Sequence, residues 1–173
     1  NLPVVWGGVH PSLLPEQTLE HPLVNLIAIG EGETTLLELV KALKSKKKLD
    51  TVKGIGFKKD GKITITPPRP FENLNDLPDA AYHLVNVDDY LIQQYESPRM
   101  LSFLAGRGCP YRCSYCYNSI FNKSKWRPIE AKKLVKRLKN LMKYKPDTVE
   151  FVDDLFFVSK KRVEEVCKLI IKE

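Results

Sequence analysis

The sequence lacks any long apolar run, which excludes a membrane-spanning helix of ordinary length. The longest run, residues 23–29, is strand-sized and is interrupted by Asn25, whereas a membrane helix needs about 20 apolar residues. Cysteine is also scarce, with four in the chain, and three of these lie between Cys109 and Cys116. Secreted disulfide scaffolds have paired cysteines. The clustered pattern instead indicates a metal site in a reducing compartment, and we expect a cytoplasmic protein.

The sequence has no signal peptide, internal repeat or low-complexity segment. It begins at Asn1 directly before strand-like sequence and stops at Glu173 within or just after a helical pattern. We therefore expect residues of the natural protein to be missing at both ends.

The net charge is +7, from 28 Lys and Arg against 21 Asp and Glu. Many of the lysines between Lys132 and Lys145 alternate with an apolar stripe, which is typical of a solvated helix face. Aromatic residues are not interleaved there, as a nucleic-acid platform would need. Nucleic acid is therefore not an expected partner.

The first part of the chain predicts an open α/β sheet. Apolar runs at residues 2–6 and 23–29 are typical of buried parallel strands, and each ends at a glycine turn. A short helix is expected over residues 15–20, and a hairpin is expected around Asp60-Gly61. A further helix follows the second glycine turn; its apolar face comprises Leu36, Leu37, Val40 and Leu43. Ligands of such sheets bind at the carboxyl ends of the strands.

The second part predicts a β-α-β-α run. Strands are expected at residues 100–104 and 148–152, and Pro128 suits the first turn of the helix between them. That helix has an apolar stripe formed by Leu134, Val135, Leu138, Leu141 and Met142. Ser159 is expected to cap a last helix whose inward face comprises Val163, Val166, Cys167 and Ile170.

Three segments follow from this pattern: a first domain over residues 1–70, a linker over 71–97 and a second domain over 98–173. The linker contains Pro, Asn and acidic residues, and it is expected to form short helical turns at most.

The cysteine motif carries the clearest chemistry. Cys109, Cys113 and Cys116 have the spacing Cys-x-x-x-Cys-x-x-Cys, with Tyr115 directly before the last cysteine. A structural zinc site needs four protein ligands, and the nearest histidine, His83, lies in the linker. Three thiolates suit a [4Fe–4S] cluster that leaves one iron without a protein ligand. A structural zinc site and incidental cysteines in a loop are the alternatives.

This motif, placed after the first strand of an α/β unit, resembles that of the radical S-adenosylmethionine (SAM) enzymes. The resemblance implies that the open iron chelates SAM, and that its reductive cleavage gives a 5′-deoxyadenosyl radical. It also implies that Tyr115 lies near the adenine. Asp153 and Asp154 stand where many members have a Gly-Gly-Glu-like sequence that receives the methionyl end of SAM. A helix-capping role is the alternative for these two residues.

The glycine turns extend the resemblance to the cobalamin-binding class of this family. The turns include Gly7, Gly8 and His10 after the first strand, and Gly30, Glu31 and Gly32 after the second. The class implies part of a flavodoxin-like (Rossmann-type) parallel sheet, followed by the first βαβα units of a partial TIM-like barrel. His10 is interpreted as a loop residue near the cofactor edge rather than the axial ligand. Glu31 is either a contact to the corrin or an acid at a helix start.

The resemblance implies a cobalamin-dependent methyltransferase that acts on a small molecule and receives electrons from a flavodoxin or ferredoxin. The chain alone is expected to be inactive. A cyclase, a methylthiotransferase and a non-enzymatic iron–sulfur or zinc module are the alternatives. A methylthiotransferase would have cysteines in its N-terminal domain, and none precede Cys109.

Overall fold

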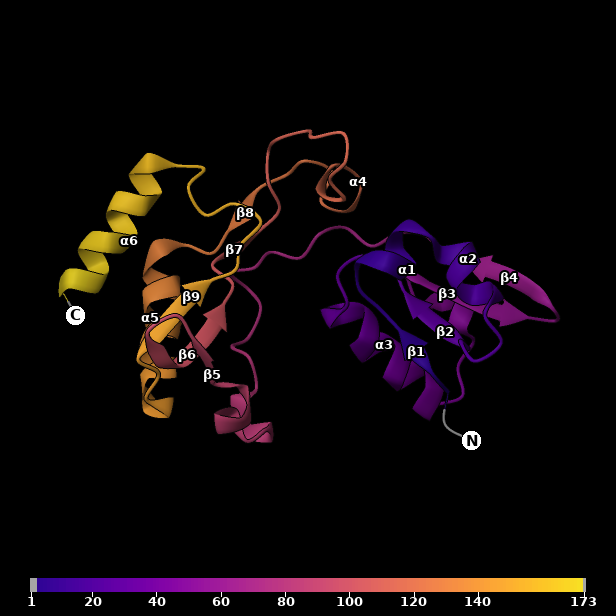
Figure 1. The fold of residues 1–173 in the computed structure, drawn as a ribbon. Coiled ribbons are helices and arrows are strands. Elements are labelled where there is room, and N and C mark those ends of the chain that lie inside the picture. Colours follow the sequence, from indigo (N-terminus) through magenta and orange to yellow (C-terminus); the bar gives the residue numbers. More distant parts are fainter. Residues whose placement is uncertain (1–2, 173) are drawn as a thin grey trace. The chain divides into compact units, whose positions relative to one another are not determined.

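The computed structural model describes residues 3–172 and divides into two compact units, one ending at Glu72 and one beginning at Asn73 (Figure 1). The division lies within the predicted linker, and the assignment of the two domains stays a prediction. Within residues 3–172, every helix is too short or too polar to cross a membrane.

The first unit is built on a four-stranded sheet in the order β1-β2-β3-β4. Its strands are β1 (Val5–Trp6), β2 (Leu26–Ala28), β3 (Ile55–Lys59) and β4 (Lys62–Ile65). β1 and β2 are parallel, as predicted, and β3 and β4 form the expected hairpin. β3 runs antiparallel to β2, so the sheet is mixed. Leu2, which the first predicted strand included, lies outside the described residues.

Helices of the first unit follow each parallel strand. They are α1 (Val9–Leu13), α2 (Pro15–Glu20) and α3 (Glu33–Lys44), with a 3-10 turn η1 at Leu49–Thr51. The helix predicted over residues 15–20 is confirmed as α2, whereas α1 was not expected. α3 packs on the sheet through a buried cluster formed by Leu26, Leu39, Ala42, Val52, Ile55 and Phe57.

The predicted inward face of α3 is wrong. Thr35, Leu39 and Ala42 are the buried residues of this helix. The four residues expected inside are 38–54% exposed: Leu36, Leu37, Val40 and Leu43. Two adjacent apolar stripes run along α3, and the pattern alone selected the one that does not face the sheet.

The second unit contains the predicted β-α-β-α run. Its elements are β6 (Ser97–Phe103), α5 (Ala131–Leu141), β9 (Thr148–Phe151) and α6 (Lys160–Lys172), with a 3-10 turn η4 at Met142–Tyr144. β6 and β9 pair in parallel, from Met100 opposite Thr148 to Phe103 opposite Phe151. α5 and α6 contribute Leu134 and Val166 to the core beside these strands.

The segment before β6 belongs to the second unit. It contains η2 (Tyr82–Leu84), η3 (Val87–Tyr90) and a short strand, β5 (Ile92–Gln94), that pairs antiparallel with β6. The expectation of helical turns at most is therefore wrong at β5. Leu74 is buried in the core of the unit, and Asp79 accepts a hydrogen bond of 2.8 Å from Nε of Arg137 on α5.

Several side chains differ from their predicted places. Val166 is the buried residue of α6. Cys167 is exposed and Ile170 is 45% exposed, although both were expected to face inward. Met142 lies beyond the end of α5 and is 48% exposed. Pro128 lies in a short strand, three residues before α5 begins, and not in the first helical turn.

Candidate functional site

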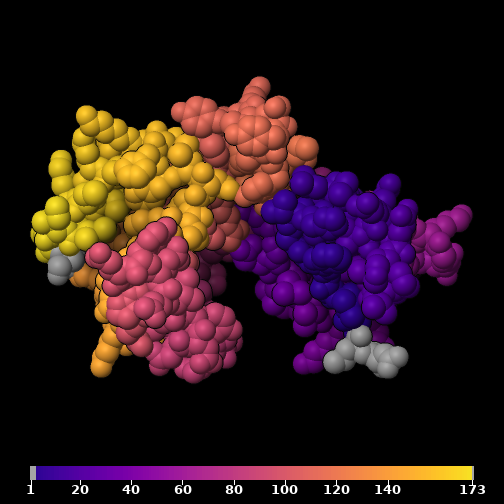
Figure 2. Space-filling model, in the orientation of Figure 1, coloured from indigo at the N-terminus to yellow at the C-terminus, as the bar shows by residue number. Residues whose placement is uncertain are grey.

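The cysteine loop follows β6 and is closed at its base by two short strands. These are β7 (Gly106–Arg107) and β8 (Arg127–Pro128), which pair antiparallel. Figure 2 shows the segment between them, coloured for residues of about 110–125, as a protrusion on the surface of the second unit. The loop therefore leaves the carboxyl end of β6, which is where a ligand site is expected in an α/β unit.

Gly108 lies where the loop crosses itself. Its φ is +79°, and a Cβ added there would come within 2.1 Å of the carbonyl oxygen of Lys125 and 3.1 Å of Cβ of Asn122. A side chain at this position would need both a left-handed backbone and space that another backbone segment fills. Glycine is therefore required by the loop's own geometry.

Cys109 is held by the side chain of Asn118, the first residue of α4 (Asn118–Phe121). The backbone N–H of Cys109 donates to Oδ1 of Asn118 at 3.0 Å, and Nδ2 of Asn118 donates to the carbonyl of Cys109 at 2.6 Å. Asn118 is only 1% exposed. One buried amide thus satisfies both backbone groups of the first cysteine.

The other two cysteines lie nearer the surface. Cys113 is exposed and Cys116 is partly buried; the N–H of Cys116 donates to the carbonyl of Cys113 at 3.1 Å. The Ser119 hydroxyl donates to the Cys116 carbonyl at 2.9 Å. Tyr115, the predicted adenine neighbour, is 91% exposed.

The thiols of the loop are not assembled into a ready metal site. Among residues 3–172, no three Cys, His, Asp or Glu side chains are grouped so that they hold an ion. The convergence of Cys109, Cys113 and Cys116 therefore stays a prediction.

Asp154 follows β9 and binds both ends of the cysteine loop. Its Oδ2 accepts from the Gly108 N–H at 2.9 Å and its Oδ1 accepts from the Tyr117 hydroxyl at 2.5 Å. The bond to Asp154, together with burial and the carboxylate charge, raises the pKa of Tyr117 to about 12. The carboxylate thus ties the residue before the first cysteine to the residue after the last.

Asp153 supports the strand that leads into the loop. Its Oδ2 accepts from the Ala105 N–H at 3.1 Å. Burial raises the pKa of Asp153, against hydrogen bonds from Ala105 and Gly106 and the nearby charge of Arg162. Helix capping was the alternative role for Asp153 and Asp154. The residue that caps α6 is Ser159, whose Oγ accepts from the Arg162 N–H at 3.3 Å.

The two glycine turns of the first unit meet at one edge of the sheet. The Ser12 hydroxyl donates to the Gly8 carbonyl at 2.6 Å and accepts from the Gly30 N–H at 2.8 Å. Gly8 and Gly30 have φ of +97° and +80°, and a Cβ added at either, or at Gly32, would meet no atom within 4 Å. This edge presents bare backbone to open space, which suits a ligand that approaches the main chain closely.

His10 has a different place from the one expected, whereas Glu31 lies directly before Gly32, the N-cap of α3. His10 lies in α1 and not in a loop, because the chain turns into a helix directly after Gly8; its ring stacks on Trp6 with centroids 5.4 Å apart. Glu31 is 8% exposed, and its Oε2 accepts from the Glu72 N–H at 2.7 Å. Glu31 therefore anchors the end of the first unit, and its predicted contact to a corrin stays untested.

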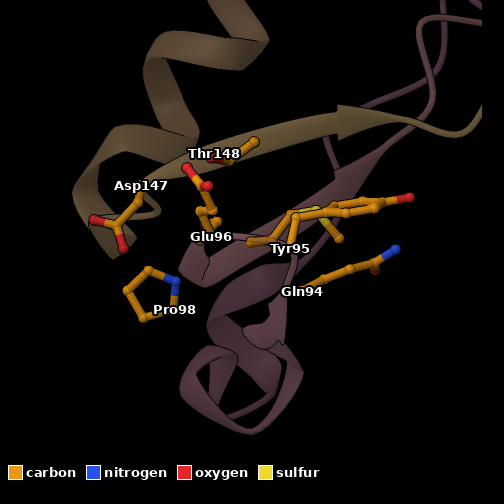
Figure 3. A pocket seen from close by; sticks show the side chains of 8 residues that line it. Gln94, Tyr95, Glu96, Pro98, Asp147 and Thr148 are labelled. Carbon is orange, nitrogen blue, oxygen red and sulfur yellow. The ribbon is translucent and has the colours of Figure 1, made fainter.

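A separate cavity of about 320 Å³ lies at the opposite end of the second sheet (Figure 3). It is lined by Gln94, Tyr95, Glu96, Ser97, Pro98, Met100, Asp147 and Thr148. Ser97 and Thr148 are the first residues of β6 and β9, whereas the cysteine loop follows the last residue of β6. The cavity is therefore not part of the candidate site.

Sequence reasoning missed three residues that shape the two sites: Ser12, Gly108 as a crossing point, and Asn118. The available signal for Asn118 was a pair of asparagines four residues apart, Asn118 and Asn122, shortly after Cys116. Both are buried, and they lie on one face of a helical turn.

Comparison with known proteins gives relatives over the whole chain, although no family model matches. The chain is 33% identical over 176 residues to an uncharacterized methyltransferase of Pyrococcus horikoshii, covering 100% of this chain and 38% of that protein. It is 31% identical over 175 residues to the anaerobic magnesium-protoporphyrin IX monomethyl ester cyclase of Synechocystis, covering 100% of this chain and 34% of the cyclase.

A solved structure has the same fold. OxsB, a cobalamin-dependent S-adenosylmethionine radical enzyme with aqua-cobalamin and S-adenosylmethionine bound, matches with a TM-score of 0.75 and 26% identity. The match covers 98% of this chain and 24% of OxsB. The chain thus spans about a third of the length of the curated relatives above and less of OxsB. The match confirms the predicted α/β fold class.

Proposed function

Because the chain belongs to the family of cobalamin-dependent radical SAM enzymes, we propose that Cys109, Cys113 and Cys116 hold a [4Fe–4S] cluster. Thiolates are the usual ligands of such clusters, and three of them leave one iron free for SAM. The observation that carries the proposal is the position of the loop, which leaves the carboxyl end of β6 in a parallel β-α-β unit.

The chain's own residues would shape and present this site. Asp154 and Asn118 bind the backbone around Cys109 and hold the loop closed, and the exposed Tyr115 is available to contact the adenine. A contact of Asp153 or Asp154 with the methionyl end of SAM stays a prediction, since both carboxylates accept backbone hydrogen bonds. Cys109, Cys113 and Cys116 would hold the cluster, which would supply the electron for reductive cleavage of SAM.

The glycine edge of the first unit is the proposed cobalamin contact. Gly8, Gly30 and Gly32 border open space, and Ser12 holds the first two turns together. Gly7 differs, because a Cβ there would meet Ala28 at 3.6 Å. A corrin and its nucleotide tail are large, so a surface without side chains allows the closest approach to the backbone.

For the whole protein we propose methylation of a small molecule, with cobalamin as the methyl carrier and a flavodoxin or ferredoxin as the electron donor. The methyltransferase relative supports this class. Cyclisation is the second candidate, because the Synechocystis cyclase is nearly as similar. A cytoplasmic location suits the reduced cysteines.

Anaerobic reconstitution tests the cluster proposal. The chain is incubated with iron and sulfide, desalted, and analysed for colour, iron and zinc, beside the variants Cys113→Ala and Cys167→Ala. Brown protein with about four irons per chain is expected, with loss of iron in Cys113→Ala. Cys167→Ala is the matched control and retains the iron, since Cys167 is exposed on α6. Colourless wild-type protein with one zinc ion would support the non-enzymatic module instead.

The cobalamin proposal has its own test. The full-length protein is loaded with hydroxocobalamin, desalted and examined for a retained corrin spectrum. Retention that falls in Gly30→Val supports the glycine edge, since a branched side chain would enter the open space beside Gly30. Retention that is equal in both proteins would place the corrin elsewhere.

A further inference from the structure

Asn118, the most deeply buried polar side chain in the described part of the second unit, is hydrogen-bonded to Cys109. Asn118 is 1% exposed and Asn122 is 3% exposed, and they are the buried polar residues of the described part of this unit. A buried amide costs free energy unless it is hydrogen-bonded. Asn118 uses its oxygen and its nitrogen on a single residue, Cys109, at 3.0 and 2.6 Å.

Asn122 fixes the C-terminal end of α4, the helix that begins at Asn118. Its Oδ1 accepts from Arg127 at 3.1 Å, and its Nδ2 approaches Oδ2 of Asp154 at 3.4 Å. Gly108 packs against Asn122 with no room for a side chain. Asn118 is therefore held in place by contacts that do not involve any cysteine sulfur.

The three cysteines differ in how firmly the loop holds them. Cys109 has both backbone groups bound by a buried side chain, whereas Cys113 is exposed. The flanking tyrosines Tyr111 and Tyr115 are 66% and 91% exposed. The loop is thus fixed at its first cysteine and open around its second.

We propose that Asn118 is a positioning residue that presets Cys109 before any cluster is present, so that Cys113 and Cys116 close onto a ligand already in place. The preset itself rests on hydrogen bonds within the chain. Its use in cluster assembly rests on the proposed function.

Thiol alkylation of the metal-free chain tests the preset without a cluster. The chain is treated with iodoacetamide, and the rate at each cysteine is followed by mass spectrometry. Cys109 is expected to react more slowly than Cys113. Asn118→Leu removes both hydrogen bonds. Because the half-buried Cys109 thiol reacts from an opened state of the loop, and losing one or two such bonds raises the population of that state, the Cys109 rate is expected to rise about tenfold.

The controls separate positioning from general loosening. Cys167 on α6 serves as the internal reference, and Asn140→Leu is the matched variant, because Asn140 is exposed on α5 and binds Asp79. If Asn118→Leu unfolds and every cysteine accelerates, Asn118→Asp decides, since it keeps the acceptor for the Cys109 N–H and loses the donor to its carbonyl. A selective rise at Cys109 supports the proposal, and an unchanged Cys109 rate in the folded variant overturns it.

A second experiment carries the inference to the cluster. Reconstituted wild-type and Asn118→Leu chains are exposed to an iron chelator, and the loss of brown colour is timed. Faster loss in Asn118→Leu, with Asn140→Leu like wild type, is the expected result. Equal rates would overturn the role of Asn118 in cluster binding. A wild-type chain that takes up no iron would contradict the proposed function instead, and the alkylation rates would still decide the preset.

Discussion

The two candidate ligand regions are built in opposite ways. The glycine edge of the first unit exposes bare backbone and is joined by one hydroxyl, that of Ser12. The cysteine loop of the second unit is held by two polar side chains: Asn118, which is buried and lies nine residues after Cys109, and Asp154, which lies 46 residues after Gly108. The glycine edge is thus joined by one side chain, whereas the cysteine loop is fixed by several side-chain hydrogen bonds.

Glycine itself shows the difference. Gly30 and Gly108 have nearly the same φ, +80° and +79°. A Cβ at Gly30 would enter open space, while one at Gly108 would meet the Lys125 carbonyl at 2.1 Å. The same backbone conformation thus borders open space in one unit and closes the loop in the other.

The largest expected effect comes from placing alanine at these two glycines. Gly108→Ala combines a left-handed backbone with a backbone clash and should lower the free energy of unfolding of the second unit by about 3 kcal/mol or more. Gly30→Ala should cost the first unit only about 1 kcal/mol, from the backbone strain. Trp6 and Trp126, the only tryptophans, report on one unit each, so fluorescence in urea follows each separately. Equal losses of unfolding free energy in the two units would show that Gly30 and Gly108 are not under different constraints.

Removing the Asp154 carboxylate should have the next largest effect. Asp154→Ala leaves the Gly108 N–H and the Tyr117 hydroxyl without their partner and should destabilise the second unit by about 1–2 kcal/mol. Asp154→Asn is the matched control, because its oxygen accepts from Gly108 and its amide donates to the Tyr117 oxygen. Urea unfolding followed at Trp126 measures both. Variants of equal stability would show that the carboxylate does not hold the loop.

Ser12→Ala should loosen the first unit by about 1 kcal/mol, since it removes two hydrogen bonds from a partly exposed site. Hydrogen exchange at the Gly30 N–H is the direct measurement, and it should accelerate in Ser12→Ala. Ser45→Ala is the control, because Ser45 binds the carbonyl of Lys41 at the end of α3. An unchanged Gly30 N–H would mean that Ser12 does not join the two turns.

The smallest expected effect is acid sensitivity at Asp79. Burial pushes the pKa of Asp79 up, but hydrogen bonds from Asn140 and Arg137 and the charge of Arg137 outweigh it, so the pKa lies below its ordinary value of 3.8. A carboxyl group whose pKa is lowered on folding stabilises the fold at pH values above its pKa in the unfolded chain. This contribution is lost as the pH falls through the pKa in the folded chain.

Asp79→Asn should therefore reduce the difference in stability of the second unit between pH 7 and pH 3, measured at Trp126. The effect is small because the Asp79 side chain is 46% exposed. Asp89→Asn removes a carboxylate elsewhere in the same segment and serves as control. An Asp79→Asn chain with unchanged pH dependence would show that this pair does not fasten residues 73–97 to α5.

Local patterns predicted the elements that depend on local chemistry. The Asp60-Gly61 turn places the β3–β4 hairpin because both residues adopt positive φ. The alternation of strand and helix after Met100 gives the parallel pair β6 and β9. The spacing of Cys109, Cys113 and Cys116 likewise identified the cysteine loop, because the motif lies within one short stretch of sequence.

The rest depends on contacts between distant residues. The apolar stripe of α3 did not reveal that Leu39, and not Leu36 or Val40, faces the sheet. Nor does any local pattern show that Asp154 reaches Gly108, 46 residues earlier in the chain. The Asp154–Gly108 contact requires the parallel pairing of β6 and β9 to be in place.

The most direct test of the central claim is the electron paramagnetic resonance spectrum of the reconstituted, reduced chain before and after SAM is added. A cluster held by Cys109, Cys113 and Cys116 has an open iron. The expected result is a [4Fe–4S]⁺ signal that changes on addition of SAM, with no signal in Cys113→Ala. A signal that SAM leaves unchanged, or that persists in Cys113→Ala, would contradict it.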